Sequence, residues 1–227
     1  MATAKRVIVI PAYCEATVIG HVVRDAVRVA HAVIVVDDGS TDRTGDEARA
    51  AGAIVVRHAI NRGAGAATST GIDAATRLGA TAIATMDADG QHRAEDVGRV
   101  LDRLDQGDVD VVIGSRMIGS ERGRMPAHRV LFNRIGNLLT FVLFGVRVTD
   151  SQSGLKGLSR KAADQLELRT NGWEFSSEFI NEVRTHGWRL VEIPIAVIYT
   201  EYSLSKGQSL GGGFRTAAKL LSRRFLG

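Results

Sequence analysis

Asp87 and Asp89 are the residues whose type and spacing point most directly to chemistry. They follow an apolar run, AIATM (82–86), that we expect to form a buried strand. On an extended segment, side chains at positions i and i+2 point to the same side. Two carboxylates placed in this way can bind Mg²⁺ or Mn²⁺ while the metal keeps coordination positions open for phosphate oxygens. An Asp-x-Asp also occurs in surface turns, so the metal interpretation depends on the strand that precedes it. His92 comes soon after and is interpreted as a turn residue rather than a ligand.

Polar and glycine-rich segments also follow four other predicted strands. The five predicted strands cover residues 6–10, 32–36, 53–56, 82–86 and 109–113. The four additional segments are PAYCE (11–15), DDGSTD (37–42), NRGAG (61–65) and GSR (114–116). Open parallel sheets bind their ligands at the carboxyl ends of the strands. One such segment is ordinary turn chemistry, but five in register indicate a ligand site at one edge of the sheet. Asp38 suits a hydrogen bond to a nucleotide base or ribose, and a helix cap is the alternative.

Predicted helices alternate with these strands. They cover residues 16–30, 42–51, 64–78 and 94–105. Thr44 and Glu47, at the start of the second helix, have the spacing of a capping box. This alternation predicts an α/β fold with a mainly parallel, twisted sheet and helices on both faces. The rest of the chain is expected to add helices at 128–146, 177–187 and 213–226 and a strand at 189–199. No stretch resembles a linker or a repeat, so residues 1–227 are predicted to form one domain.

Basic residues gather in two parts of the chain. The first, 116–134, sets Arg116, Arg122, Arg124, Arg129 and Arg134 against a single acid. The second, 202–227, contains basic residues and no acid. Such clusters suit phosphate groups or an anionic membrane surface, and a solvated basic face is the alternative. Aromatic residues make up only 5% of the chain and do not interleave with the arginines, so we expect no nucleic-acid partner.

Two segments bear on a membrane. The uninterrupted apolar part of 128–146 is too short to span a bilayer of about 30 Å, so this helix belongs either to the core or to a membrane interface. Residues 213–226 have the pattern of a basic amphipathic helix that would lie among lipid head groups. We therefore expect a peripheral protein at the inner face of the cell membrane, in the cytoplasm.

Composition excludes several other classes of protein. Apolar residues make up 44% and charged residues 24% of the 227 residues, as in soluble globular chains, so disorder and fibrous repeats are excluded. The single cysteine, Cys14, excludes a disulfide framework and a thiolate zinc site. No signal peptide is visible. The glycines at 61–65 match neither a dinucleotide fingerprint nor a P-loop.

The order and spacing of these motifs resemble a known family. PAYCE, VVDDGSTD, NRGAGAA, DADGQH, VIGSR, DSQSGLKGLSR and a late SK occur together in the inverting family 2 glycosyltransferases. Within these, the chain is most similar to the polyprenyl-phosphate (dolichyl-phosphate) mannosyl- and glucosyltransferases, from Val7 to about Phe225. The resemblance implies the GT-A nucleotide-diphosphosugar transferase fold. It also implies a nucleotide-sugar and metal half at 1–116 and an acceptor half at 117–227.

The resemblance also implies roles for individual residues. The implied donor-binding residues are Pro11, Tyr13, Glu15, Val36, Asp38, Asp87, Ala88, Asp89, Gln91, Arg116 and Lys206. The implied ligands of Mg²⁺ or Mn²⁺ are Asp87, Asp89 and Gln91, with Asp89 as the main one. The implied catalytic residues are Asp89, Gln91, Arg116 and Asp150. The implied contacts of an acceptor phosphate are Arg116, Arg134, Ser153 and Lys156.

Two positions depart from the family pattern. Cys14 stands where the family usually has asparagine. Thr200 stands where mannosyl members often have arginine, which weakens an assignment to GDP-mannose. The expected reaction moves one sugar, with inversion, from a donor of the GDP-mannose or UDP-glucose type to a polyprenyl phosphate. A homo-oligomer remains an open alternative to a monomer.

Two other functions compete with this prediction. A family 2 enzyme with a saccharide or small-molecule hydroxyl acceptor would need a carboxylate base, and Asp150 and Glu178 are the candidates. A lipid phosphate is already anionic near pH 7 and needs no strong base. The second competing function is a non-catalytic nucleotide-binding module, and the intact Asp-x-Asp-x-Gln at 87–91 argues against it.

Overall fold

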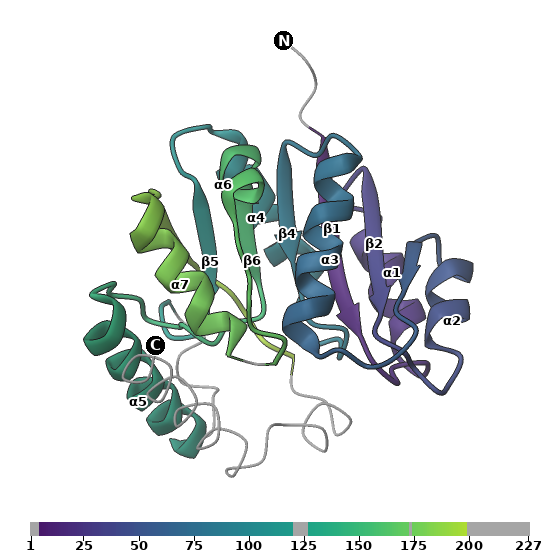
Figure 1. Cartoon of the computed structure of the whole chain (residues 1–227), viewed down its shortest axis with the longest axis horizontal. Coiled ribbons are helices and arrows are strands. Elements are labelled where there is room, and N and C mark those ends of the chain that lie inside the picture. The colour runs from purple at the N-terminus through teal and green to yellow at the C-terminus, as the bar shows by residue number, and fades with distance from the viewer. Residues whose placement is uncertain (1–4, 120–126, 173, 199–227) are drawn as a thin grey trace.

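A seven-stranded sheet forms the centre of the protein in a computed structural model that describes residues 5–119, 127–172 and 174–198 (Figure 1). The strand order is β3-β2-β1-β4-β6-β5-β7. The strands are β1 (Arg6–Ala12), β2 (Ala32–Asp37), β3 (Ile54–Arg57), β4 (Ala82–Thr85), β5 (Val111–Ser115), β6 (Lys156–Ser159) and β7 (Leu190–Pro194). All paired strands are parallel except for β6, which runs antiparallel to both β4 and β5.

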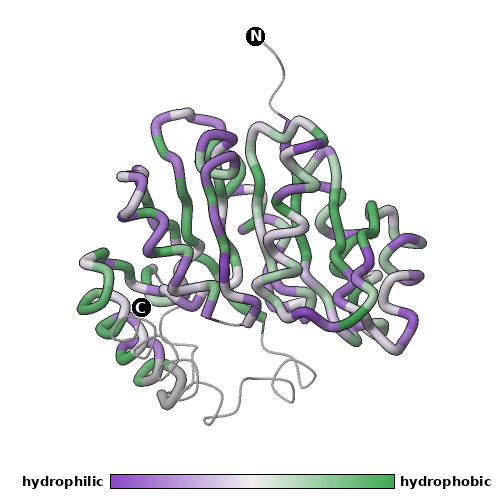
Figure 2. The backbone as a smooth tube through the Cα atoms, in the orientation of Figure 1, coloured by the Kyte–Doolittle hydropathy of each residue, from purple (hydrophilic) through white to green (hydrophobic). Residues whose placement is uncertain are grey.

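Both faces of the sheet are covered. In β1, Ile8 and Ile10 belong to one apolar core while Val7 and Val9 belong to a second core on the opposite face. A strand buried on both faces is apolar throughout instead of alternating, which is why RVIVI lacks a polar face. Figure 2 shows that the hydrophobic residues concentrate along the central strands. The predicted mainly parallel sheet between two helical layers is confirmed.

The helices divide between these two cores. The first core contains α1 (Ile19–Ala26), α2 (Thr44–Ala50) and α4 (Ala94–Asp105). The second contains α3 (Ala64–Arg77), α6 (Arg160–Gln165) and α7 (Phe175–His186). The remaining helix, α5 (Ala127–Phe144), contacts α7 at the end of the sheet where the polar loops lie (Figure 1). No helix in the described ranges is both long enough and apolar enough to cross a membrane.

Most predicted elements are confirmed to within a few residues, and the exceptions have local causes. The predicted capping box is wrong, because Thr44 lies inside α2 and its hydroxyl contacts Asp42 and the backbone N–H of Glu15. Asp42 instead accepts the N–H of Thr44 at 3.0 Å. The last predicted strand is shorter than expected and ends at Pro194.

Neither β6 nor α6 was predicted from the sequence. The sequence of β6, KGLS, has one large apolar residue, Leu158, and no alternation that would indicate a strand. Its strand conformation is accompanied by antiparallel pairing with both β4 and β5. The predicted helix at 213–226 and the residues Lys206 and Thr200 lie outside the described residues. The predicted division at residue 116 remains a prediction, although strands from both sides of it share the sheet.

Candidate active site

The loops after β1 and β2 are joined at the carboxyl edge of the sheet. The backbone N–H of Cys14 donates to Ser40 Oγ at 2.9 Å, and the N–H of Glu15 donates to Thr44 Oγ1 at 2.8 Å. Cys14 adopts a positive φ of 54°, the left-handed conformation that asparagine accepts more readily than cysteine does. The first loop is therefore shaped by the hydroxyl groups of the second loop.

Asp38 joins the second loop to the third. Its buried carboxylate contacts His58 Nδ1 at 2.6 Å and accepts the backbone N–H groups of Arg62 and Gly63 at 2.9 and 2.7 Å. These contacts place the carboxylate against the NRGAG segment. The alternative role as a helix cap is not the one that Asp38 takes. A nucleoside contact for this residue remains a prediction.

The other residues predicted to line a nucleoside pocket differ in exposure. Tyr13 is exposed, and Pro11 and Glu15 are partly buried. The carboxylate of Glu15 lies near enough to Asp89 to raise the pKa of that aspartate. Val36 is completely buried among core side chains. Glu15 thus reaches the site directly, whereas Val36 supports it from within the core.

Asp87 and Asp89 lie together in a strongly polarised environment. Burial acts to raise the pKa of Asp87, but His92, Lys156 and Arg116 together bring it below its ordinary value. Burial and the charge of Asp87 both raise the pKa of Asp89. The two carboxylates therefore repel each other, and His92 acts on both of them, whereas Lys156 and Arg116 act on Asp87.

The residues between and after the two aspartates complete this segment. Ala88 is buried in the first core, and the backbone N–H of Gln91 donates to Asp89 Oδ1 at 3.0 Å. His92 is not an exposed turn residue: it pairs with Val197 in an isolated bridge, and its ring is buried 3.5 Å from Asp87 Oδ2. Neither ring nitrogen has a hydrogen-bond partner among the residues that the structure describes. The ring of His92 thus forms one wall of the site.

The loop 150–155 packs directly on Asp87. A Cβ at Gly154 would overlap the Asp87 carboxylate, so a larger residue there would force that carboxylate to shift. Lys156 is 1% exposed, and its ammonium group donates to Ser153 O and lies 5.4 Å from the centre of the Phe175 ring. Burial lowers the pKa of Lys156 to about 8, although nearby carboxylates oppose the shift. Ser153, within this loop, and Lys156, directly after it, are both buried. Their predicted contact with an acceptor phosphate remains a prediction.

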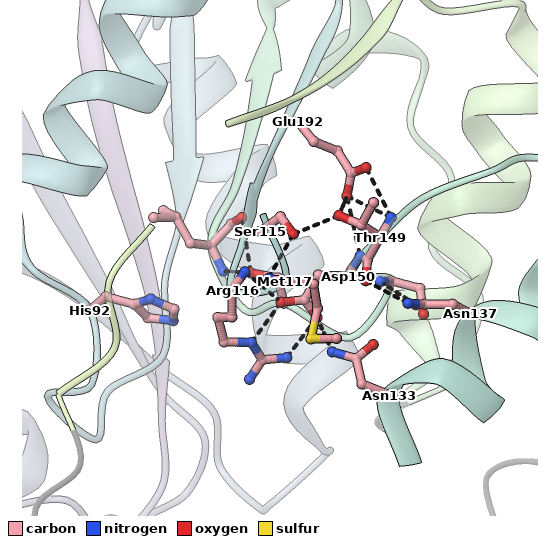
Figure 3. Close-up of polar contacts among 12 residues, drawn as sticks. His92, Ser115, Arg116, Met117, Asn133, Asn137, Thr149, Asp150 and Glu192 are labelled. Carbon is pink, nitrogen blue, oxygen red and sulfur yellow. Dashed lines mark hydrogen bonds and ion pairs between the residues drawn. The ribbon is translucent and has the colours of Figure 1, made fainter. Parts of the chain in front are cut away.

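Arg116 and Asp150 form the most heavily bonded pair of the site (Figure 3). Arg116 Nε and Nη2 donate to the two oxygens of Asp150 at 2.6 and 2.7 Å, and the Arg116 backbone N–H donates to the same carboxylate at 3.0 Å. Asn133 Nδ2 of α5 adds a further bond at 2.7 Å. Asp150 is 0% exposed, whereas 23% of the Arg116 side chain is exposed. Burial acts to raise the pKa of Asp150, but these contacts hold it below its ordinary value.

Two residues outside the predicted set, Glu192 and Asn137, hold the chain around Asp150. Glu192 of β7 accepts the backbone N–H and the hydroxyl of Thr149 at 2.9 Å and the backbone N–H of Asp150 at 3.2 Å. Asn137 of α5 donates to Thr149 O at 2.5 Å and accepts the N–H of Ser151 at 2.9 Å. The sequence pattern of β7 predicts a strand and that of α5 predicts a helix, but neither pattern indicates that Glu192 or Asn137 contacts residues 149–151.

Two predicted residues lie at the margin of this cluster. Arg134 of α5 is exposed, and its predicted contact with an acceptor phosphate remains a prediction. Glu178 of α7 accepts the backbone N–H groups of Arg169 and Thr170 at 2.8 and 2.9 Å and the Thr170 hydroxyl at 2.5 Å. Its carboxylate is therefore used to fix the turn before α7.

Comparison with known proteins identifies this arrangement. The sequence model described as "Glycosyl transferase family 2" matches residues 7–167. The chain belongs to glycosyl transferase family 2. Two curated relatives of this glycosyltransferase are similar over nearly its whole length. A UDP-N-acetylglucosamine–dolichyl-phosphate N-acetylglucosaminyltransferase of Methanococcus voltae is 35% identical over 94% of each chain. A polyprenol monophosphomannose synthase of Mycolicibacterium smegmatis is 32% identical over 95% of this chain and 84% of the relative.

A solved structure shows the same fold. Glucosyl-3-phosphoglycerate synthase of Mycobacterium tuberculosis, in complex with Mn²⁺, UDP and glucosyl-3-phosphoglycerate, matches 98% of this chain and 80% of its own. The TM-score is 0.77 at 20% sequence identity. The GT-A fold predicted for the glycosyltransferase is therefore confirmed, while the ligands of that structure remain properties of the other protein.

The metal-ligating oxygen atoms of Asp87 and Asp89 in this glycosyltransferase fit a divalent cation that is also bound by a substrate. The described residues contain no group of three or more His, Cys, Asp or Glu side chains arranged as a metal cage. Asp87 and Asp89 nevertheless supply two hard oxygen donors whose mutual repulsion raises the pKa of Asp89. Mg²⁺ is commonly bound by one or two carboxylates together with water and substrate phosphates. The residues present fit that kind of site.

Proposed function

We propose that this family 2 glycosyltransferase moves a single sugar, with inversion and with a divalent metal ion, from a nucleotide-diphosphosugar to a polyprenyl phosphate. The names of the two relatives support a lipid phosphate as the acceptor class. Those names give different sugars, so the donor, of the UDP-glucose or GDP-mannose type, is left to experiment. The soluble-acceptor alternative remains a competing outcome.

The state of Asp150 is the observation that carries this proposal. A hydroxyl acceptor would need a general base, and the two candidate carboxylates are Asp150 and Glu178. Asp150 is 0% exposed and bound by Arg116 and Asn133, and Glu178 is bound by Arg169 and Thr170. A lowered pKa also makes Asp150 a weak base. An acceptor phosphate arrives already ionised and does not need either carboxylate.

The chemistry follows from the charges around the site. Attack by an acceptor phosphate oxygen forms a bond to the anomeric carbon while the bond from that carbon to the donor diphosphate breaks, so negative charge grows on the leaving diphosphate. Asp87, Asp89 and Gln91 would hold the metal ion, which supplies positive charge for that diphosphate. Arg116 can meet a phosphate from the protein side, because part of its side chain is exposed. Attack from the opposite side of the sugar gives inversion, and the protein mainly orients the two substrates.

The surface of α5 supports contact with a membrane. The side chains of Leu131, Ile135, Leu138 and Val142 are between 45% and 69% exposed and recur at helical spacing along one stripe. No acidic residue occurs in α5. The opposite face carries Asn133 and Asn137, which contact the Asp150 loop. Of the two alternatives for this helix, the exposed stripe favours a membrane interface over the core. A position at the inner face of the cell membrane remains a prediction.

A transfer assay tests the reaction. Purified protein is incubated with Mn²⁺ or Mg²⁺, with UDP- and GDP-sugars in turn, and with a short polyprenyl phosphate or a panel of saccharides. We expect transfer to the lipid phosphate only, loss of transfer in EDTA, and a product whose anomeric configuration is opposite to that of the donor. Transfer to a saccharide but not to the lipid phosphate would overturn the proposal.

A liposome experiment tests the membrane surface. Leu138→Gln together with Val142→Gln should weaken co-sedimentation with anionic vesicles and leave nucleotide binding unchanged. Leu78→Gln at the end of α3 is the matched control, because Leu78 is also an exposed leucine but lies away from α5. Equal co-sedimentation of the parent and the double variant would contradict the role of the α5 stripe.

A further inference from the structure

We propose that Glu192 is a positioning residue that sets the orientation of the Arg116 guanidinium through the backbone at Thr149 and Asp150. The inference rests on the proposed function, because it assigns Arg116 to a substrate phosphate. It adds a residue that lies outside the motifs on which the resemblance to the family rests and far from Asp87 and Asp89 in the sequence.

The contacts of Glu192 converge on two consecutive residues. Both of its carboxylate oxygens lie 2.9 Å from the backbone N–H of Thr149, and one also accepts the Thr149 hydroxyl at 2.9 Å. The same oxygen accepts the backbone N–H of Asp150 at 3.2 Å. Several bonds from one charged acceptor fix the backbone just where the Asp150 side chain leaves it.

The sheet holds both ends of this chain of contacts. Glu192 pairs in register with Ile113 on the neighbouring strand β5, and the backbone of β5 continues directly to Arg116. The hydroxyls of Ser115 and Thr149 lie 2.6 Å apart (Figure 3). The Asp150 loop is therefore tied to β7 through Glu192 and to β5 through Ser115. A rigid sheet thus sets the position of the carboxylate that Arg116 grips.

The orientation of Arg116 follows from the position of Asp150. Two parallel N–H···O bonds join a planar guanidinium to a carboxylate, so turning or shifting the carboxylate turns the guanidinium with it. Asp150 is completely buried and has no solvent to absorb such a shift. A displacement of a functional group by about 1 Å can cost about 100-fold in rate. Loss of the Glu192 anchor should therefore slow transfer without removing any residue that touches a substrate.

A double-mutant cycle tests this coupling. Glu192→Gln retains size and some hydrogen bonding but loses the charge, and we expect its kcat for transfer to fall about tenfold with unchanged affinity for the nucleotide. In an Arg116→Ala background the same Glu192→Gln change should cost less than twofold, because its effect passes through Arg116. Asp164→Asn on α6 is the matched control, since it removes an exposed carboxylate that accepts from Arg160 and lies away from the site. An equal loss from Glu192→Gln in both backgrounds would overturn the proposal.

Amide hydrogen exchange supplies a second measurement that does not depend on activity. Glu192→Gln should speed exchange at the amides of Thr149 and Asp150 and leave the β1 amides unchanged. Unchanged exchange at both residues would overturn the proposed anchor. If the parent transfers no sugar to any acceptor, the proposed function fails, and the exchange result alone still decides whether Glu192 holds the loop.

Discussion

The two sides of the site are built in different ways. On the side of β1, β2, β3 and β4, which includes Asp87 and Asp89, the links run mainly from a backbone N–H to a side-chain oxygen, as in the bonds from Arg62 and Gly63 to Asp38. On the side of β5, β6 and β7, side chains of α5 and β7 hold the Arg116–Asp150 pair, Asn133 through the Asp150 carboxylate and Glu192 through the Asp150 N–H. The first design depends on short motifs, and the second depends on where distant elements pack. The two sides should therefore respond differently to substitution.

The largest effect is expected at Asp89, which follows β4 on the first side of the site. Asp89→Asn removes one charge at nearly constant volume and should reduce transfer by about 1,000-fold or more while the fold is retained. Transfer rate and melting temperature are measured against Asp73→Asn, which changes an exposed aspartate of α3. Undiminished turnover in Asp89→Asn, or full activity of the parent in excess EDTA, would show that no metal acts through this residue.

Asp150→Asn tests whether the second side depends on one buried ion pair. The substitution leaves the Arg116 guanidinium without its charged partner, so we expect the free energy of unfolding to fall by about 3 kcal/mol. Asp38→Asn on the first side should cost less, because it leaves no guanidinium without its partner. Its amide oxygen can still accept one of the N–H groups of Arg62 and Gly63, which bind different oxygens of Asp38. Urea unfolding of both variants measures the difference. A greater loss in Asp38→Asn would reverse the contrast drawn between the two sides.

Gly154→Ala tests the contact between the two sides. The added Cβ would overlap the Asp87 carboxylate and push it away from Asp89, so transfer should fall about 100-fold and the free energy of unfolding by about 1 to 3 kcal/mol. The control is Gly136→Ala in α5, where the nearest atom to the new Cβ is 3.9 Å away. Transfer by Gly154→Ala at the parental rate would mean that Asp87 can move without consequence.

The lowered pKa of Asp150 predicts an acid dependence of stability. A carboxyl group with a depressed folded-state pKa stabilises the protein above its ordinary value of 3.8, and that contribution is lost as the pH falls through the folded-state pKa. The difference in unfolding free energy between the parent and Asp150→Asn should therefore be constant near neutral pH and shrink below about pH 4. Chemical unfolding at several pH values measures it. A difference that grows as the solution is acidified would contradict the assignment.

The smallest effect is expected at Cys14. Its φ of 54° is a conformation in which asparagine is enriched, so Cys14→Asn should raise the free energy of unfolding by about 0.5 kcal/mol. Cys14→Val places a branched side chain in the same conformation and should lower it. Thermal unfolding of the two variants measures both changes. Equal melting temperatures would show that the first loop tolerates either side chain.

Much of the first side could be predicted from the sequence because its information is local. A run of buried residues such as VIVI specifies a strand, and a polar segment that follows the strand must lie at the carboxyl edge of a parallel sheet. Asp87 and Asp89 are located in this way, and they lie close enough for burial and the charge of Asp87 to raise the pKa of Asp89. The exact partners of Asp38 could not be predicted, since they depend on how the third loop folds back.

The sequence by itself determined the α/β architecture with helices on both faces of the sheet, the family, and the sheet edge at which the polar segments gather. It could do so because strand periodicity and motif order are properties of neighbouring residues. Only the tertiary structure decided that Lys156 is buried, that β6 lies between β4 and β5, and that Glu192 anchors Asp150. Each of these depends on residues that are dozens of positions apart in the chain. Neither hydrophobic periodicity nor a short motif records such pairs, because the free energy that selects them comes from packing and from the need to pair buried charges.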